Sequence, residues 1–207
     1  MAISEVVWDM DGTLLDTARA VPAAYIAATE ELCGRTVDRD EVLRLYPVGP
    51  PAEILARLVG RVLSAEEEEA YYRRLGESPV DPFPGVAETL AALASRGKRL
   101  AVFTGASHRA AEILLASAGI GPDVLIGGDE VPAMKPAPDG LAMAAQKLGR
   151  EPGELAYVGD SPLDMRAASA AGFAAWSPSW GHMYEPETPA DRVLDRPGEV
   201  LGLLNGF

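Results

Sequence analysis

The sequence has little cysteine, few basic residues and no long apolar run. Its one cysteine, Cys33, excludes an intramolecular disulfide and fits a reducing cytosol. Because Cys33 falls in a helical pattern, we expect a small buried side chain there rather than a nucleophile. No apolar run approaches the roughly 20 residues that span a bilayer, and no basic segment followed by an apolar stretch opens the chain. We therefore expect a cytoplasmic protein without a signal peptide or membrane contact.

The shortage of basic residues narrows the range of partners. Lys and Arg together number 18 against 31 Asp and Glu, which gives a formal net charge of −13 at pH 7. Phosphate backbones are bound by clusters of Lys and Arg, so this charge argues against nucleic acid. A small phosphorylated metabolite stays compatible with it, because a local site can be positive inside an acidic protein.

From residue 83 onward, strand and helix patterns alternate. Short apolar runs that end in turn residues predict strands, and the stretches with helical spacing between them predict helices. Such alternation is typical of a mainly parallel, doubly wound α/β sheet with right-handed crossovers. With one strand near the N-terminus, the predicted strands are residues 6–8, 98–103, 124–126, 155–158 and, as the last, 173–176. The predicted helices are residues 86–96, 109–118, 138–148, 165–171 and 199–204.

The segment between the first strand and residue 83 has helical spacing throughout and no convincing strand. We predict helices over residues 21–32, 39–46, 52–59 and 64–75. Gly34 and Gly60 end two of them, and Ser64 with Glu67 has the spacing of a capping box. The chain is therefore predicted to form one Rossmann-like core, residues 1–16 and 83–207, interrupted by a small all-helical cap, residues 17–82.

The first strand ends in two acids. Asp9 follows the apolar run of residues 6–8, and Asp11 comes two positions later, just before Gly12. Ligands of open α/β sheets bind at the carboxyl ends of the strands, so we expect both carboxylates in a site. Two carboxylates this close repel each other, and a dry pocket that holds both needs a cation. This spacing therefore indicates a divalent metal.

Other strand ends carry complementary groups. Thr104 and Gly105 follow one strand, Lys135 stands in a loop with prolines, and Asp160 and Asp164 follow another strand. If these ends converge, they bring together acids for a metal, one ammonium, one hydroxyl and flexible backbone amides. Phosphoryl transfer needs such a set: an oxygen nucleophile, a divalent ion, and cationic or N–H groups around the phosphoryl charge.

Four segments resemble, in the same order, the motifs of the haloacid dehalogenase superfamily. They are residues 9–14 (DMDGTL), 103–105 (FTG), 135–138 (KPAP) and 159–164 (GDSPLD). The helical segment resembles the C1 cap of that superfamily. Residues 167–172 and 180–191 resemble its phosphoglycolate-phosphatase-like branch, to which β-phosphoglucomutase-like proteins are close.

The resemblance implies a role for each acid. Asp9 would be the nucleophile that forms an aspartyl-phosphate, and Asp11 would be the general acid and then the general base. Mg²⁺ would be held by the carboxylates of Asp9 and Asp160 and by the backbone carbonyl of Asp11. Asp164 would lie just outside these ligands or reach the ion through water.

The same resemblance implies how the phosphoryl group is held. The Thr104 hydroxyl and the backbone amides of Met10 and Gly105 would bind its oxygens. Lys135 would neutralise charge on the phosphoryl group and on the nucleophile.

Several of these residues, and some others, have structural explanations. Asp164 could equally be the N-cap of the helix expected from residue 165. We expect Asp16 to tie down the loop after the nucleophile and Trp8 to pack in the core. His108 and His182 are expected at the surface, with a substrate contact as the lesser alternative.

The predicted cap should select the substrate, because a lid that closes over a site excludes water and contacts the leaving group. Arg44, Tyr46 and Arg57, near the turn at residues 48–51, are candidates to meet a second anionic group. A solvated helix face is the better explanation for each of them when taken singly.

The resemblance thus implies a Mg²⁺-dependent phosphatase, monomeric or homodimeric, that hydrolyses a small phosphate monoester such as phosphoglycolate or a sugar phosphate. A phosphomutase of the same superfamily would keep every core residue and stays an alternative. A haloacid dehalogenase is disfavoured, because that branch lacks the acid at Asp11. A non-enzymatic receiver-type signalling module is the alternative from another class; it has no helical insert and no acids like Asp160 and Asp164 after its lysine.

Overall fold

One parallel sheet organises the molecule. The structure is a computed structural model that describes residues 3–205. Its strands lie in the order β3-β2-β1-β4-β5-β6, and every neighbouring pair is parallel. The strands are β1 (Glu5–Trp8), β2 (Ala101–Phe103), β3 (Val124–Ile126), β4 (Leu155–Val158), β5 (Ala174–Pro178) and β6 (Arg192–Leu194). The mainly parallel α/β sheet expected from the sequence is confirmed.

The central strand β1 contributes side chains to the apolar clusters on both faces of the sheet. Successive side chains of a strand point to opposite faces, and Val6 and Trp8 belong to one apolar cluster while Val7 belongs to the other. Helices α7 (Asp139–Leu148) and α8 (Pro162–Ala171) pack on the face of Val7. Helices α5 (Val86–Ser95) and α6 (His108–Ser117) cover the opposite face. Trp8 is 1% exposed, which confirms its place in the core.

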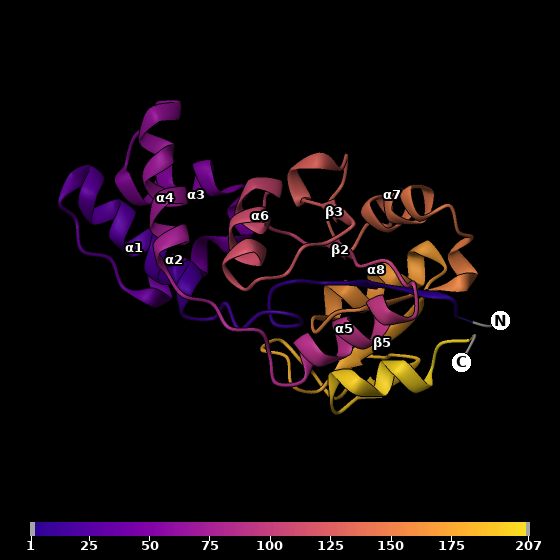
Figure 1. Cartoon of the computed structure of the whole chain (residues 1–207). Coiled ribbons are helices and arrows are strands. Elements are labelled where there is room, and N and C mark those ends of the chain that lie inside the picture. Colours follow the sequence, from indigo (N-terminus) through magenta and orange to yellow (C-terminus); the bar gives the residue numbers. More distant parts are fainter. Residues whose placement is uncertain (1–2, 206–207) are drawn as a thin grey trace.

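The segment 17–82 is helical throughout. It contains α1 (Ala20–Cys33), α2 (Arg39–Leu45), the 3₁₀ turn η1 (Tyr46–Val48), α3 (Pro51–Val59) and α4 (Ala65–Glu77). Gly34 and Gly60 end α1 and α3 in the left-handed region, at φ 70° and 85°, where a residue with a Cβ would be strained. Ser64 and Glu67 form the predicted capping box of α4. We call residues 17–82 the helical insert; it projects from one end of the sheet (Figure 1).

The chain leaves the sheet and returns to it along paired segments. Leu15 forms an isolated antiparallel bridge with Pro82, and the Asp16 amide donates to the Asp81 carbonyl at 3.0 Å. The Phe83 amide donates to the Leu14 carbonyl at 3.0 Å. The two connections to the insert therefore support each other and form a hinge beside the loop of Asp9 and Asp11.

The structure differs from the predicted elements at several points. Strand β2 begins at Ala101 rather than residue 98, because the Leu100 amide donates to the Asp123 side chain instead of a neighbouring strand. Helix α8 begins at Pro162 rather than residue 165. Strand β5 is not the last: β6 follows it, a three-residue edge strand with two exposed side chains and hence no alternation signal. The last helix is the 3₁₀ segment η4 (Pro197–Gly202).

The remaining structural expectations concern the surface. Cys33 is exposed rather than buried, because it ends α1 on the solvent side; its thiol donates to the Thr29 carbonyl. Short 3₁₀ turns, η2 (Gly128–Glu130) and η3 (Pro152–Glu154), precede α7 and β4. Within the described chain, no helix has the length and apolar character needed to cross a bilayer.

Candidate active site

The loop after β1 places two acids at the carboxyl edge of the sheet. Asp9 is 4% exposed, and its amide donates to the Val158 carbonyl at 2.8 Å, which continues the β1–β4 ladder by one step. The chain then turns at Gly12, whose φ is 77°. The amides of Leu14 and Leu15 both donate to the Met10 carbonyl at 3.0 Å. The loop is thus folded on itself, and it holds Asp11 apart from Asp9.

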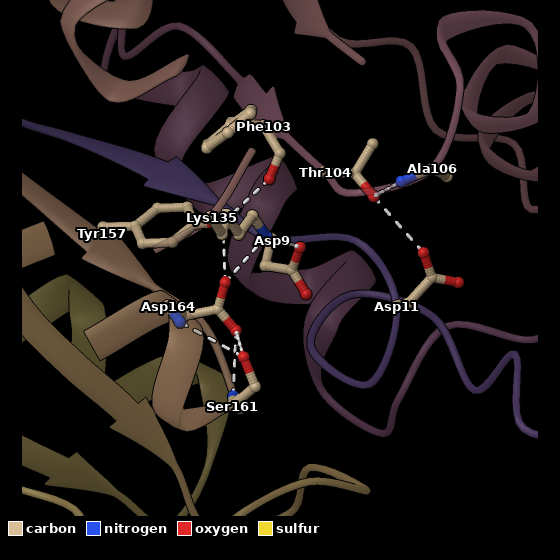
Figure 2. A network of polar contacts seen from close by, with 9 residues as sticks. All are labelled: Asp9, Asp11, Phe103, Thr104, Ala106, Lys135, Tyr157, Ser161 and Asp164. Atoms are coloured by element: carbon tan, nitrogen blue, oxygen red, sulfur yellow. Dashed lines mark hydrogen bonds and ion pairs between the residues drawn. The ribbon is translucent and has the colours of Figure 1, made fainter. Parts of the chain in front are cut away.

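Lys135 joins the nucleophile candidate to a second acid. Its Nζ lies 2.6 Å from Asp9 Oδ1 and 2.7 Å from Asp164 Oδ1, with a side chain 9% exposed (Figure 2). The ammonium also lies 5.0 Å from the ring centroid of Phe103 and 5.3 Å from that of Tyr157. Burial alone would lower the pKa of Lys135, but the carboxylates of Asp164 and Asp9 outweigh it and raise that pKa. Lys135 is therefore a fixed positive charge within the acidic cluster.

Asp11 faces a different partner. The Thr104 hydroxyl donates to Asp11 Oδ2 at 3.3 Å and accepts from the Ala106 amide at 3.1 Å (Figure 2). Burial raises the pKa of Asp11, and hydrogen bonds from Thr17 and Thr104 with the charges of Lys135 and His182 only partly oppose this. A carboxyl group with a raised pKa keeps its proton to higher pH, as a general acid requires.

Asp164 is the best-bonded acid of the group. Its Oδ2 accepts from the Ser161 amide at 2.9 Å and from the Ser161 hydroxyl at 2.5 Å, and the Tyr157 hydroxyl donates to its Oδ1 at 3.2 Å (Figure 2). Burial would raise the pKa of Asp164, but Lys135 and Ser161 reverse this and lower it. The N-cap of α8 is Ser161, and Asp164 is the third helical residue of its capping box. The N-cap assignment for Asp164 was therefore wrong, because the helix starts one turn earlier.

Two glycines allow neighbouring chain segments to lie close to Asp160. A Cβ added at Gly12 would lie 2.2 Å from Asp160 Oδ2, and one added at Gly181 would lie 2.1 Å from Asp160 Cβ. The Met183 amide donates to Asp160 Oδ2 at 2.8 Å. Burial, opposed by this hydrogen bond and reinforced by the charge of Asp164, raises the pKa of Asp160 to about 6.

The donor set of this cluster suits a divalent metal. Carboxylate oxygens of Asp9, Asp160 and Asp164 lie within 4.8 Å of one another, and all three residues are buried. Burial raises the pKa of Asp9 well above its usual range; Lys135 opposes this, while Asp164 and Asp160 add to it. Four acids therefore face one ammonium, and a hard, oxygen-binding cation would remove the remaining repulsion. These residues fit Mg²⁺.

Two backbone amides near the acids remain available for a ligand. Among the described residues, no acceptor takes a hydrogen bond from the amides of Met10 or Gly105. An additional Cβ at Gly128 would lie 2.6 Å from the Gly105 carbonyl, so the chain runs close behind this loop. The amides and the Thr104 hydroxyl match the groups expected to hold phosphoryl oxygens.

The contacts of the loop after β5 were not predicted from the sequence. The Trp180 indole donates to the Thr13 carbonyl at 3.0 Å, and His182 Nε2 lies 3.0 Å from Asp16 Oδ1. The His182 ring lies 5.2 Å from that of Phe83, at the hinge. This loop joins Asp160 to both connections of the insert. Gly181 permits the close approach to Asp160, but the sequence alone does not show which segment it approaches.

Some candidates lie away from the acids. His108 Nδ1 lies 2.6 Å from Glu130 Oε2 in an exposed pair, where the hydrogen bond that the imidazole donates to Glu130 and the charge of Glu130 raise the pKa of His108 against its burial. Arg44 and Arg57 are exposed in the insert, where no hydrogen bond or ion pair of the described chain involves their side chains. Tyr46 is 40% exposed in the insert, and its ring lies 6.4 Å from that of Tyr25.

Comparisons with known proteins agree with this geometry. The family model described as haloacid dehalogenase-like hydrolase matches residues 4–172. A phosphoglycolate phosphatase of Pectobacterium atrosepticum is 34% identical over 225 residues, which cover 98% of this chain and 93% of the relative. The crystal structure of CbbY from Rhodobacter sphaeroides with phosphate matches with a TM-score of 0.80 at 28% identity, covering 97% of this chain and 99% of CbbY.

A further structure of a CbbY variant, in complex with xylulose-(1,5)bisphosphate, has a TM-score of 0.80 at 27% identity and covers 98% of this chain and 99% of that one. The family match and the enzymes among the relatives decide against a receiver-type signalling module. The chain belongs to the haloacid dehalogenase-like hydrolases and is an enzyme of the phosphatase kind.

Proposed function

We propose that this protein is a Mg²⁺-dependent phosphatase that hydrolyses a small phosphate monoester through a phosphorylated Asp9. The observation that carries the proposal is the division of labour between two acids two residues apart. Lys135 binds Asp9 Oδ1 at 2.6 Å, whereas Asp11 faces the Thr104 hydroxyl at 3.3 Å. Burial raises the pKa of both carboxyls; the adjacent ammonium, together with a bound Mg²⁺, would favour the ionised form of Asp9 for attack, and Asp11 would keep a proton for donation.

The first half-reaction transfers the phosphoryl group to the protein. Asp9 attacks phosphorus, the bond between phosphorus and the alcohol oxygen breaks, and Asp11 gives its proton to the leaving oxygen. The amides of Met10 and Gly105, the Thr104 hydroxyl and the Lys135 ammonium hold the phosphoryl oxygens as charge spreads over them. The carboxylates of Asp9 and Asp160 and the Asp11 carbonyl would hold Mg²⁺, which would supply charge neutralisation and alignment.

The second half-reaction returns the free enzyme. Asp11, now ionised, takes a proton from water, and the resulting oxygen attacks phosphorus. The bond from phosphorus to Asp9 breaks and inorganic phosphate leaves. Asp164 holds Lys135 and the start of α8 in place rather than reacting, since its oxygens bind Lys135, Ser161 and Tyr157. In this proposal residues 17–82 act as the cap over the core of residues 1–16 and 83–207.

The test is phosphate release from a panel of phosphomonoesters with Mg²⁺ and with chelator. Asp9→Asn keeps the size of the side chain but removes the nucleophile, and it should lower kcat by about a thousandfold or more. Asp40→Asn, at an exposed position in α2, is the matched control and should leave kcat unchanged. Turnover that survives in Asp9→Asn would refute the nucleophile. Isomerised products without phosphate release would indicate a phosphomutase instead.

A further inference from the structure

Tyr157, the third residue of β4, is a buried phenol that takes no part in the two half-reactions. Its hydroxyl oxygen lies 2.9 Å from the Phe103 carbonyl oxygen and 3.2 Å from Asp164 Oδ1 (Figure 2). Phe103 ends β2 directly before Thr104, and Asp164 is the acid that holds Lys135. The phenol therefore lies between the two sides of the proposed phosphoryl site.

The two contacts of this hydroxyl compete for one hydrogen. A phenol carries a single O–H donor, whereas a carbonyl and an ionised carboxylate only accept. Burial and the negative charges of Asp164 and Asp9 raise the pKa of Tyr157, so the hydroxyl keeps its hydrogen at neutral pH. The hydrogen can point to the Phe103 carbonyl, which is the nearer acceptor, or turn to Asp164, but it does not serve both fully.

Both acceptors are held in place by other groups. A Cβ added at Gly140 would lie 2.2 Å from the Phe103 ring, so α7 packs directly against that side chain. Asp164 Oδ2 accepts from the Ser161 amide at 2.9 Å and from the Ser161 hydroxyl at 2.5 Å. Because both acceptors are fixed, rotation about the C–O bond of the phenol decides which of them receives the hydrogen.

Asp164 Oδ1 has a second partner, which is the Lys135 ammonium. Its Nζ lies 2.7 Å from this oxygen and 2.6 Å from Asp9 Oδ1. A phosphoryl group that binds at Lys135 brings further negative charge and competes with Asp164 for the ammonium. As the ammonium moves toward the phosphoryl group, Asp164 Oδ1 loses part of its donation. A buried carboxylate oxygen without a donor is costly, so the loss would oppose phosphoryl binding unless another donor replaced it.

We propose that Tyr157 is a positioning residue for phosphoryl binding: its hydroxyl is a reserve donor that turns from the Phe103 carbonyl to Asp164 when the phosphoryl group draws Lys135 toward itself. The inference rests on the proposed phosphatase function and adds a residue to it. No proton is transferred in this step, because the phenol keeps its hydrogen and only the direction of the O–H bond changes. Tyr157 acts on the phosphoryl group through Asp164 and Lys135, without touching it.

Tyr157→Phe removes the hydroxyl and keeps the ring, whose centroid lies 5.3 Å from the Lys135 ammonium. The probe is inorganic phosphate, titrated calorimetrically into the protein with Mg²⁺ present. We expect the Kd for phosphate to rise by about tenfold, because Asp164 then retains the ammonium. In phosphate-release assays kcat/KM should fall by a similar factor. Phosphate binding within about twofold of the wild type in Tyr157→Phe overturns the proposal.

Thr89→Val is the matched control, because it also removes one buried hydroxyl that donates to a backbone carbonyl. Thr89 is 2% exposed, and its hydroxyl donates to the Gly85 carbonyl at 2.6 Å on α5, which covers the opposite face of the sheet. Urea unfolding measures what each variant loses in stability. Thr89→Val should bind phosphate as the wild type does. An equal loss of phosphate affinity in both variants would reflect general destabilisation and would overturn the role of Tyr157.

A double-mutant cycle with Lys135→Ala tests the route of the effect. Without the ammonium, Asp164 has nothing to release, so adding Tyr157→Phe to Lys135→Ala should change kcat/KM by less than about twofold. A further tenfold loss in the double variant would mean that Tyr157 acts independently of Lys135, and the reserve-donor role would be wrong.

The calorimetric measurement keeps this inference apart from the proposed function. If the wild type releases phosphate from no monoester, the phosphatase proposal fails, and the comparison of phosphate binding between the wild type and Tyr157→Phe still decides the role of Tyr157. A wild type that binds no phosphate refutes the reserve donor as well.

Discussion

The ion pairs at the edge of the sheet are buried, whereas those of the helical insert are exposed. At the sheet edge, Lys135 pairs with Asp9 and Asp164, and the three side chains are 9%, 6% and 2% exposed. In the insert, charged pairs such as Arg74 with Glu31 lie in solvent, at 37% and 33% exposure. A buried ion pair is sensitive to loss of either partner, whereas an exposed one contributes little. The chemistry therefore depends on individual core residues, and the insert can vary its surface and keep its fold.

Among the changes that test this contrast between core and insert, removal of the Lys135 ammonium should have the largest effect. Lys135→Ala leaves Asp9, Asp160 and Asp164 facing one another, and it removes a positive charge from the phosphoryl site. We expect kcat to fall by about a hundredfold to a thousandfold in steady-state phosphate release. Loss of one partner of a buried ion pair should also lower the free energy of unfolding by about 3 kcal/mol, measured in urea.

Lys147→Ala provides the matched control, because Lys147 is exposed on α7 and far from the acids. It should change neither kcat nor stability. If Lys135→Ala turns over within a few fold of the wild type, the core is as tolerant as the insert, and the contrast between the two regions is wrong.

A smaller effect is expected from a substitution in the loop after β5, which contains Gly181. In Gly181→Ala the new Cβ would lie 2.1 Å from Asp160 Cβ, so Asp160 or the loop must move. The position of one proposed metal ligand changes while all the acids remain. We expect the affinity for Mg²⁺ to fall by about tenfold or more, measured by calorimetry without substrate. Trp180, next to the substitution, gives a second readout by fluorescence.

Gly121→Ala is the control for this change, because a Cβ there meets nothing within 4 Å. It should bind Mg²⁺ as the wild type does. An unchanged affinity for Mg²⁺ in Gly181→Ala would show that Asp160 tolerates displacement. It would contradict a role of the loop after β5 in positioning Asp160.

Features of the site that depend on local sequence patterns could be predicted, whereas features that depend on contacts between distant positions could not. Asp9, Thr104 and Asp160 each follow a short apolar strand, so local patterning and the rule of strand ends were enough to bring them together. Gly181 reaches Asp160 across 21 positions, and Trp180 reaches Thr13 across 167. Such contacts leave no periodic trace in the chain. A closely approaching glycine becomes visible only when both segments have been placed in space.

The helical insert shows the same difference between local and long-range features. Its helices were predicted almost to the residue, because Gly34, Gly60 and Ser64 mark their ends locally. The stacking of Tyr25 on Tyr71 was not predicted, because these residues lie on different helices, 46 positions apart. Strand β6 was missed for a related reason: three residues, two of them exposed, carry too little pattern for recognition.

The smallest effect should come from the contact that joins the two regions. Both terminal guanidinium nitrogens of Arg109, on α6, donate to the Glu69 carboxylate, on α4, at 2.5 Å. The Cζ atom of Arg109 lies 4.2 Å from the Tyr72 ring centroid. Both charged side chains are about half exposed, so salt screens the pair. Arg109→Ala should loosen the docking of the insert and raise KM by about twofold at low salt, with kcat unchanged.

The comparison with Arg61→Ala makes this effect specific to docking. Arg61 pairs with Glu67 inside the insert, at similar exposure, so its loss removes an ion pair without touching the contact with the core. KM should stay at the wild-type value in Arg61→Ala, and the difference between the two variants should vanish at about 1 M salt, where the Debye length is about 3 Å. An equal rise of KM in both variants would mean that the insert responds to its own surface charge, and the Arg109 contact would then have no separate part in closing the site.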